Sequence, residues 1–233
     1  ADEAELNLIP TLWLRNLWDW GYKEDWRQRE PIRLQGDCIE TPDVHGVGTY
    51  QLACREQGTW LFTENETNTE RLYQQPNAQP YVKDAFHRYV VNGEQTAVNP
   101  AQEGTKAGLL LQQRIAGGAE WVVDLRLARE LPADPFDGSF DQLLQQREQE
   151  CLDYFKSCAP GLSADDALIF RSAASGLLWC KKFYRWTVVR WLSGDPNHPS
   201  PPPERLKTQN AYWRRMHADD VISMPDSWEY PYF

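Results

Sequence analysis

The sequence predicts an α+β protein of more than one domain, in which a partial antiparallel β-sandwich is followed by helices. Up to residue 115 the apolar residues fall in short runs separated by Gly, Pro and Asn, which is typical of short strands. After residue 130 the runs lengthen and take a helical period. The length of 233 residues allows one large or two modest domains.

Strands are expected at residues 5–15, 47–54, 59–63, 88–91 and 106–115. The clearest strand is expected at residues 119–129, where the apolar side chains alternate with polar ones and share one face: Trp121, Val123, Leu125 and Leu127. Gly117-Gly118 predicts a hairpin that joins this strand to the preceding one. Strands at this spacing indicate part of an antiparallel sandwich.

Two long helices are expected after the breaker segment LPADPFDG. The first covers residues 139–158 and would be about 30 Å long, enough to bridge two domains. The second begins at Ser163, which forms an acidic variant of a capping box with Asp166, and continues to Leu192. Its apolar residues surround most of its circumference, so we expect it inside a larger helical assembly. Residues 194–203 are proline-rich and form either a flexible linker or a rigid loop between helices.

Charge and cysteine content exclude several classes of protein. The net charge of −10 argues against nucleic acid as a partner, because binding phosphates requires concentrated Lys and Arg. The sequence has no apolar run long enough to span a membrane. Five cysteines without a C-x-x-C pair suggest neither a disulfide framework nor a zinc site, and we expect a reducing, cytoplasmic location.

Aromatic residues and carboxylates crowd together in residues 212–233. Aromatic faces stack on the apolar faces of sugar rings, and carboxylates accept hydrogen bonds from sugar hydroxyls. Carboxylates in loops more often cap backbone groups or face solvent, and spacing alone selects no catalytic pair. The candidate sugar-binding residues here are Trp213, Asp226, Trp228, Glu229 and Tyr230.

A second polar segment, LFTENETNTERL (residues 61–72), follows a predicted strand and offers Asn65, Glu66 and Asn68 as candidate binding residues. Such a loop can hold sugar hydroxyls, or its side chains can bond to local backbone groups, and residue chemistry favours the second interpretation slightly. The four histidines are scattered and no nucleotide-binding loop is present, so the sequence predicts no metal or organic cofactor.

Five segments together resemble bacterial proteins of glycoside hydrolase family 63, relatives of the processing oligosaccharide glucosidases. The segments are IPTLWLRNLWDWG (9–21), LFTENETNTERL (61–72), PYVKDAFHRYVVNG (80–93), AVNP with GTKA (97–107) and VISMPDSWEYPYF (221–233). The resemblance implies a β-sandwich, a helical linker and an (α/α)6 barrel. It places the end of the sandwich in residues 1–130, the linker in 131–161, and the first helix and long loop of the barrel in 162–233.

The resemblance also implies an inverting α-glucosidase-like hydrolase that acts on oligosaccharides without a cofactor. In such enzymes the general acid lies in a W-D motif beyond the segment matching WEYPYF, and the base lies later in the barrel. We therefore expect no catalytic residue within this chain, inactivity of the chain alone, and cover for its exposed surfaces from the rest of the protein. A noncatalytic carbohydrate-binding or interaction module is the main alternative, and a structural domain whose Trp residues are all in the core is a third.

Overall fold

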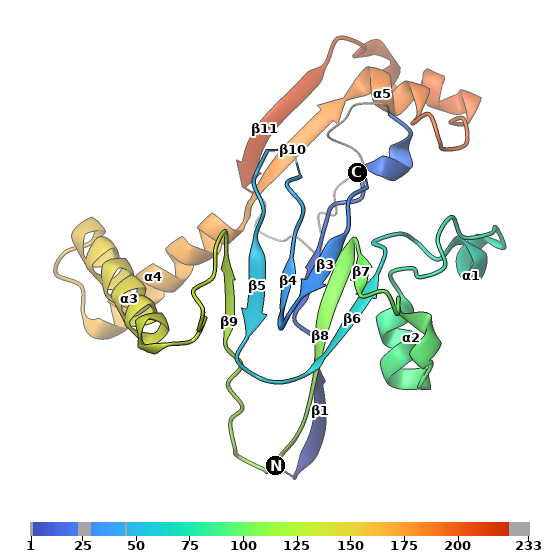
Figure 1. Ribbon diagram of the computed structural model, residues 1–233. Helices are drawn as coiled ribbons and strands as arrows, with labels where there is room; N and C mark the ends of the chain where they lie inside the picture. The colour runs from blue at the N-terminus through green and yellow to red at the C-terminus, as the bar shows by residue number, and fades with distance from the viewer. Residues whose placement is uncertain (1, 23–28, 45, 224–233) are drawn as a thin grey trace. The chain divides into compact units, whose positions relative to one another are not determined.

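The computed structural model describes residues 2–22, 29–44 and 46–223, and the chain divides into two compact units, Ala1–Asp137 (unit 1) and Gly138–Phe233 (unit 2) (Figure 1). Unit 1 consists mainly of antiparallel strands, and unit 2 contains the long helices. The chain is therefore an α+β protein, as predicted. Its order of antiparallel sheets followed by helices is compatible with a partial β-sandwich at the start.

Unit 1 contains two antiparallel sheets. In the first sheet β8 (Lys106–Ile115) is the central strand, and it pairs with β1 (Ala4–Leu8), β2 (Thr11–Trp13) and β6 (Thr59–Thr63). The second sheet contains, in spatial order, β7 (Glu103–Gly104), β3 (Ile32–Gln35), β4 (Cys38–Glu40), β5 (Gln51–Cys54) and β9 (Leu125–Ala128). Because β7 and β8 are separated by Thr105 alone, the chain passes from one sheet to the other at that residue.

The core of unit 1 lies between its two sheets. Ile32, Ile39 and Leu52 come from the second sheet and pack with Phe62 and Ala107 from the first. Ile32, Ile39 and Ala107 are completely buried. Side chains from both sheets thus form one apolar cluster, which is the packing of a sandwich.

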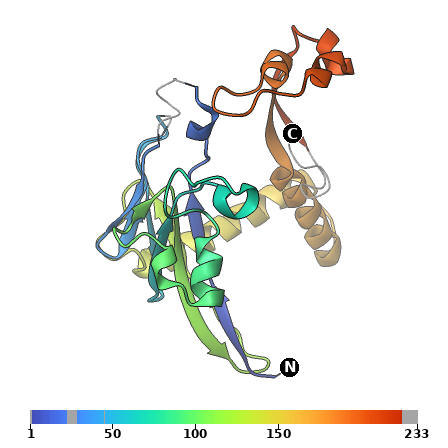
Figure 2. The ribbon, with the colours of Figure 1, turned by 90° about the vertical axis from the view of Figure 1, so that its right-hand side faces the viewer.

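The outer face of the first sheet is covered by the helix α2 (Ala85–Asn92), which lies beside β6 in both views (Figures 1 and 2). Leu61 points away from Phe62 because side chains alternate along a strand, and it packs against Phe86 of α2 and Leu110 of β8. Residues 88–91 were predicted to form a strand, and that prediction is wrong. The helix ends at Gly93, whose φ of 71° favours glycine.

The other strand predictions have mixed outcomes. Strands at residues 59–63 and 106–115 are confirmed, and the segment 5–15 forms two strands separated by Ile9-Pro10. Only residues 51–54 of the predicted strand 47–54 are extended. Only residues 125–128 of the segment 119–129 form a strand, and they pair with β5, so the predicted hairpin at Gly117-Gly118 is wrong. Strands β3, β4 and β7 were not predicted.

Shorter helices complete unit 1. They are the 3₁₀ helices η1 (Trp18–Trp20) and η3 (Gln95–Ala97) and the helix α1 (Thr69–Tyr73). Asn68 caps α1 by accepting a 3.0 Å hydrogen bond from the backbone N–H of Arg71.

Unit 2 begins with a helical hairpin of α3 (Gly138–Cys158) and α4 (Ala164–Trp179). Phe155 of α3 contacts Phe170 of α4 edge to face, with ring centroids 6.0 Å apart. The helix at 139–158 is confirmed. The cap is confirmed too, because the Ser163 hydroxyl accepts a 3.2 Å hydrogen bond from the backbone N–H of Asp166.

The second predicted helix ends earlier than expected. In place of a helix that continues to Leu192, the chain forms the strand β10 (Lys181–Thr187) and the short helix α5 (Val188–Ser193). Strand β10 pairs along its whole length with β11 (His217–Ser223). The sequence KKFYRWT combines aromatic residues with a β-branched one, which favours a strand once a partner is present.

The rest of unit 2 is irregular or made of single 3₁₀ turns. Residues 194–202 have no helix or strand, as their prolines predict. The 3₁₀ helices η4 (Pro203–Lys207) and η5 (Gln209–Tyr212) follow. Arg205 of η4 donates a 2.8 Å hydrogen bond to the carbonyl of Trp191 and places its guanidinium over that ring.

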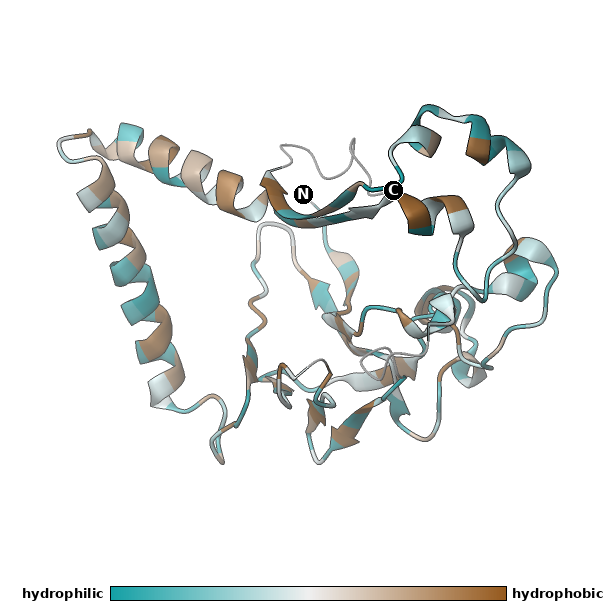
Figure 3. Cartoon of the chain, turned by 90° about the horizontal axis from the view of Figure 1, so that it is seen from above, coloured by the Kyte–Doolittle hydropathy of each residue, from teal (hydrophilic) through white to brown (hydrophobic). Residues whose placement is uncertain are grey.

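Helix α4 exposes a broad apolar surface, which Figure 3 colours largely brown. Its large side chains Leu168, Ile169, Leu177, Leu178 and Trp179 are between 53% and 82% exposed. Such a large exposed apolar surface is unusual for a helix of a soluble protein. Among the described residues, no helix combines the length and apolar character needed to cross a bilayer.

Candidate functional site

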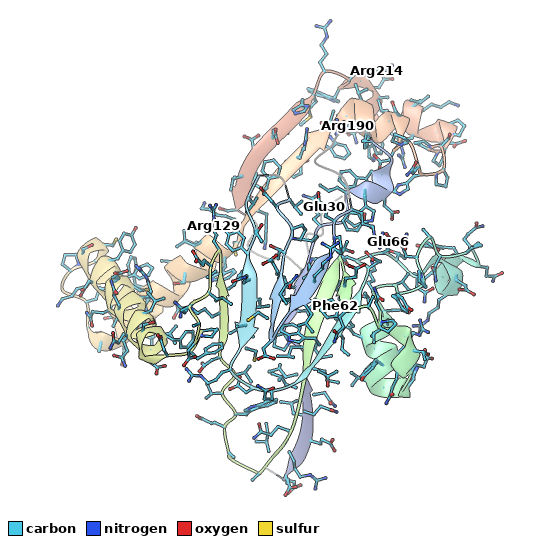
Figure 4. The ribbon with its side chains drawn as sticks, viewed as in Figure 1. Glu30, Phe62, Glu66, Arg129, Arg190 and Arg214 are labelled. Carbon is cyan, nitrogen blue, oxygen red and sulfur yellow. The ribbon has the colours of Figure 1, made fainter. Side chains whose placement is uncertain are left out.

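A buried polar cluster of unit 1 lies where the chain passes between the two sheets. Its centre is the segment after β6, which carries Glu64, Asn65 and Glu66. Glu64 and Glu66 are 4% and 6% exposed, respectively. Carboxylates are rarely buried to this extent unless specific partners compensate for the loss of water. The partners of these two residues therefore define the candidate site, and Glu66 is labelled in Figure 4.

Glu64 is held by an arginine and a threonine. Arg29 donates to both carboxylate oxygens, with a distance of 2.9 Å from its Nε to Oε2. Thr105 adds a 2.7 Å bond from its hydroxyl and a 3.3 Å bond from its backbone N–H to Oε2. Burial alone would raise the pKa of Glu64, but the hydrogen bonds from Arg29 and Thr105 outweigh it and lower the pKa. Glu64 is thus a fixed anion.

Glycine is required beside this arrangement. A Cβ atom added at Gly104 would lie 2.3 Å from the backbone oxygen of Thr63, closer than any packed contact allows. Only glycine lets β7 pass Thr63 so closely and bring Thr105 to Glu64.

Glu66 has the opposite electrostatic character. Its Oε1 accepts a 2.9 Å hydrogen bond from the indole Nε1 of Trp18, in the turn η1. The described residues give its Oε2 no hydrogen-bond donor. Burial is the main cause that raises the pKa of Glu66, and the charges of Asp19 and Glu64 add to it. Two neighbouring carboxylates therefore differ in their readiness to bind a proton.

Asn65 joins three segments of the chain. Its backbone N–H donates 2.8 Å to the Thr105 hydroxyl, and its side-chain amide donates 2.9 Å to the carbonyl of Leu14. Its carbonyl accepts a 3.2 Å bond from the side chain of Asn16. All of these groups are within the protein, so Asn65 acts as a structural junction in this structure.

Asn68 is also engaged within its own loop. Besides capping α1, it donates to both carboxylate oxygens of Asp84 at 3.1 and 3.3 Å and accepts a 3.2 Å bond from Asn77. Asn68 thus shows the local bonding that residue chemistry favoured, Asn65 bonds to distant segments instead, and Glu66 keeps one oxygen available.

The turn that contains Trp18 was absent from the set of candidate residues. Its signal was the sequence NLWDWG, in which two Trp residues flank Asp19. Asn16 fixes the turn by accepting a 3.2 Å bond from the backbone N–H of Asp19 and donating 3.3 Å to its carboxylate. That this turn meets the segment after β6 could not be predicted from the sequence, because the contact joins residues about 48 positions apart.

The other candidates are distributed differently. Trp213 lies in unit 2 at the end of η5 and is 59% exposed. Asp226, Trp228, Glu229 and Tyr230 lie outside the described residues. Within the described part of the chain, no group of three His, Cys, Asp or Glu side chains could hold a metal ion.

An open hollow of about 740 Å³ lies beside α1 and is lined by residues 70 and 74–80.

Fold and site together define an α+β protein whose unit 1 has two antiparallel sheets and a buried carboxylate cluster where the chain passes between them. The chain is 37% identical over 187 residues to the uncharacterized protein YMR196W of Saccharomyces cerevisiae. This alignment covers 74% of the chain but 17% of the yeast protein, so the chain spans less than a fifth of that relative. No protein-family model matches the chain. No solved structure matches it significantly.

Proposed function

We propose that this chain is part of a glycoside hydrolase that cleaves oligosaccharides with inversion, as in family 63. The observation that carries the proposal is the convergence of four of the motifs on which the resemblance rests. Trp18 belongs to IPTLWLRNLWDWG, Glu64 and Glu66 belong to LFTENETNTERL, and Thr105 belongs to GTKA.

The fourth motif, PYVKDAFHRYVVNG, joins the same cluster through its backbone. The backbone N–H of Glu64 donates 2.8 Å to the carbonyl of Tyr81, and the N–H of Lys83 donates 3.0 Å to the carbonyl of Glu66. Motifs far apart in the sequence thus bond to one another. This is expected when a set of unusual motifs specifies one structural element rather than occurring by chance.

The proposed mechanism uses two carboxyl groups that lie outside this chain. One protonates the glycosidic oxygen, and the other activates a water molecule on the opposite face of the sugar, at a separation of about 6.5–9.5 Å. No metal or organic cofactor is needed for this chemistry. The isolated 233-residue chain is accordingly proposed to be inactive.

Unit 2 contributes the beginning of the catalytic barrel in this proposal. The apolar surface of α4 supports it, because further helices would cover that surface. Trp228, Glu229 and Tyr230 are proposed to contact the sugar near the general acid. If Trp228→Ala in the longer protein leaves both substrate affinity and rate unchanged, that role is wrong. The five free cysteines support the further proposal of a cytoplasmic location.

The proposal is tested by expressing the complete open reading frame that contains this chain. The intact mass of its product is first measured by mass spectrometry. The product is then incubated with α-linked oligosaccharides, and the anomeric form of the released sugar is followed by NMR. Release with inversion is the expected result. Absence of hydrolysis across α- and β-linked substrates would contradict the proposal, as would turnover by the pure 233-residue chain.

A carbohydrate-binding module without catalysis is the second candidate. The exposed rings of Trp179 and Trp213 favour it, because they are 82% and 59% exposed and offer stacking faces. An oligosaccharide titration followed by tryptophan fluorescence separates it from a purely structural domain. Rings that stack on sugar change their emission, whereas rings in a core do not.

A further inference from the structure

We propose that Trp18, Asp19, Trp20 and Glu66 form a carbohydrate-binding surface in unit 1, here named the Trp18 surface. The two carboxylates accept hydrogen bonds from sugar hydroxyls, and the two indole rings supply the apolar face. The choice of sugar as the ligand class rests on the proposed function. The surface itself is inferred from the contacts of these residues.

The first step is that the surface is built rigidly from two distant segments. The indole N–H of Trp18 donates to Glu66, and the side chain of Asn16 donates to the carbonyl of Asn65. These two bonds tie the turn at residues 16–20 to the end of β6 at two points. A rigid platform loses little conformational entropy when a ligand binds.

The second step concerns the acceptors. Asp19 is exposed, and one of its oxygens accepts a bond from Asn16. Glu66 is 6% exposed and uses one oxygen for Trp18. Each carboxylate thus has a second oxygen to which the described residues give no donor. A carboxylate acceptor makes a stronger hydrogen bond to a hydroxyl than a neutral acceptor does.

The third step concerns the rings. Trp18 and Trp20 are both partly exposed. The guanidinium of Arg15 lies 5.9 Å from the centre of the Trp20 ring. An aromatic face beside hydrogen-bonding groups suits a sugar, which has apolar C–H faces and a rim of hydroxyls.

The charge of the surface decides between ligand classes. The two carboxylates repel an anion, which disfavours phosphate and acidic sugars even though Arg15 lies over Trp20. A cation is the competing class, because it is attracted by carboxylates and by aromatic faces. A neutral hydroxyl ligand is favoured because the described residues give Oε2 of Glu66 no donor, and a sugar hydroxyl supplies one whereas a quaternary ammonium ion supplies none.

The test uses the ¹⁵N-labelled 233-residue chain and calorimetry with two probes, maltotriose and tetramethylammonium. We expect maltotriose to bind saturably and to shift the indole N–H signal of Trp18. Asp19→Asn should lower the affinity for maltotriose at least about tenfold, which is the scale of one charge-assisted hydrogen bond. Asp37→Asn is the matched control, because Asp37 is an exposed carboxylate in another turn of unit 1.

Three results would overturn the inference. They are no saturable binding of maltotriose, binding of tetramethylammonium alone, or equal affinities of Asp19→Asn and Asp37→Asn for maltotriose. Hydrolysis is measured separately on the unsubstituted product of the complete open reading frame. If that product hydrolyses oligosaccharides while the chain fails to bind maltotriose, the Trp18 surface is wrong and the proposed function stands. If both results are negative, both proposals fall.

Discussion

The indole Nε1 of Trp18 lies 2.9 Å from Oε1 of Glu66, although 48 residues separate them in the chain. This bond closes the loop between the turn η1 and the end of β6. It also leaves a carboxylate at a position where most carboxylates would be unfavourable, because Glu66 is buried and close to two other acidic residues. Retaining an ionised acid at this position opposes folding.

Glu66→Gln should increase the free energy of unfolding at pH 7 and have little effect near pH 4. Because the folded-state pKa of Glu66 is raised, its contribution to stability is complete below the ordinary glutamate pKa and is lost as pH rises through the folded value. Glutamine removes that loss. Urea unfolding at both pH values measures the difference between variant and wild type.

The control for this prediction is Glu5→Gln, which changes an exposed carboxylate on β1. It should leave the unfolding free energy nearly unchanged at both pH values. Equal effects of the two substitutions, or a loss of stability in Glu66→Gln at pH 7, would contradict the electrostatic account of Glu66.

Arg29→Met should destabilise unit 1 by about 2 kcal/mol or more at pH 7, because it leaves the carboxylate of Glu64 buried without its cation. The pKa of Glu64 is lowered, so its stabilising contribution is present above the ordinary pKa and is lost as pH falls. The effect of the substitution should therefore shrink in acid. Urea titrations at pH 7 and pH 3.5 test both statements.

Arg33→Met provides the comparison within the same unit. Arg33 pairs with Glu103 at 3.0 Å, but their side chains are 54% and 43% exposed. Such an exposed pair contributes about 0–1 kcal/mol. If both arginine substitutions lower the free energy of unfolding by the same amount, burial of Glu64 is not what makes its ion pair stabilising.

The sequence predicted the elements whose pattern is local and missed those decided by contacts. Strand β8 and helix α3 were predicted almost to the residue, because each has a long, regular pattern. Residues 88–91 contain Tyr and Val and looked like a strand, but Phe86 packs on the sheet and places this segment in a helix. The end of α4 was missed because β10 depends on β11, about 35 residues later.

The candidate site shows the same division. The chemistry of residues 64–68 was visible as a run of amides and carboxylates, and Glu66 was among the candidates. Its burial and its bond to Trp18 could not be read from the sequence, because they arise only when η1 meets the end of β6. Local bonding of Asn68 was foreseeable, since asparagine commonly caps helices.

Thr63→Val should leave the protein as stable or raise its stability by about 1 kcal/mol. Thr63 is completely buried, and its hydroxyl oxygen has no hydrogen-bond partner in the described part of the chain. Valine has the same shape without the unsatisfied polar group. Thermal unfolding of the variant measures the change.

Thr41→Val is the matched substitution for comparison. Thr41 is 9% exposed, but its hydroxyl accepts a 2.9 Å hydrogen bond from the backbone N–H of Tyr50. Removing that acceptor should cost about 1–2 kcal/mol. If Thr63→Val lowers stability as much as Thr41→Val does, the hydroxyl of Thr63 has a hydrogen-bond partner in solution, either water or another group.

Gly104→Ala should destabilise unit 1 by about 1–3 kcal/mol, because the new methyl group would meet the backbone oxygen of Thr63 at 2.3 Å and force the strand away. The movement would also carry Thr105 away from Glu64, so the pKa of Glu64 should rise towards its ordinary value. NMR titration of the Glu64 carboxyl and urea unfolding measure the two effects. Gly138→Ala makes the same change where no atom lies within 4 Å, so it should be neutral. A neutral Gly104→Ala with an unchanged Glu64 titration would show that β7 can move without disturbing the cluster, and that the close passage at Thr63 is not what holds Thr105 in place.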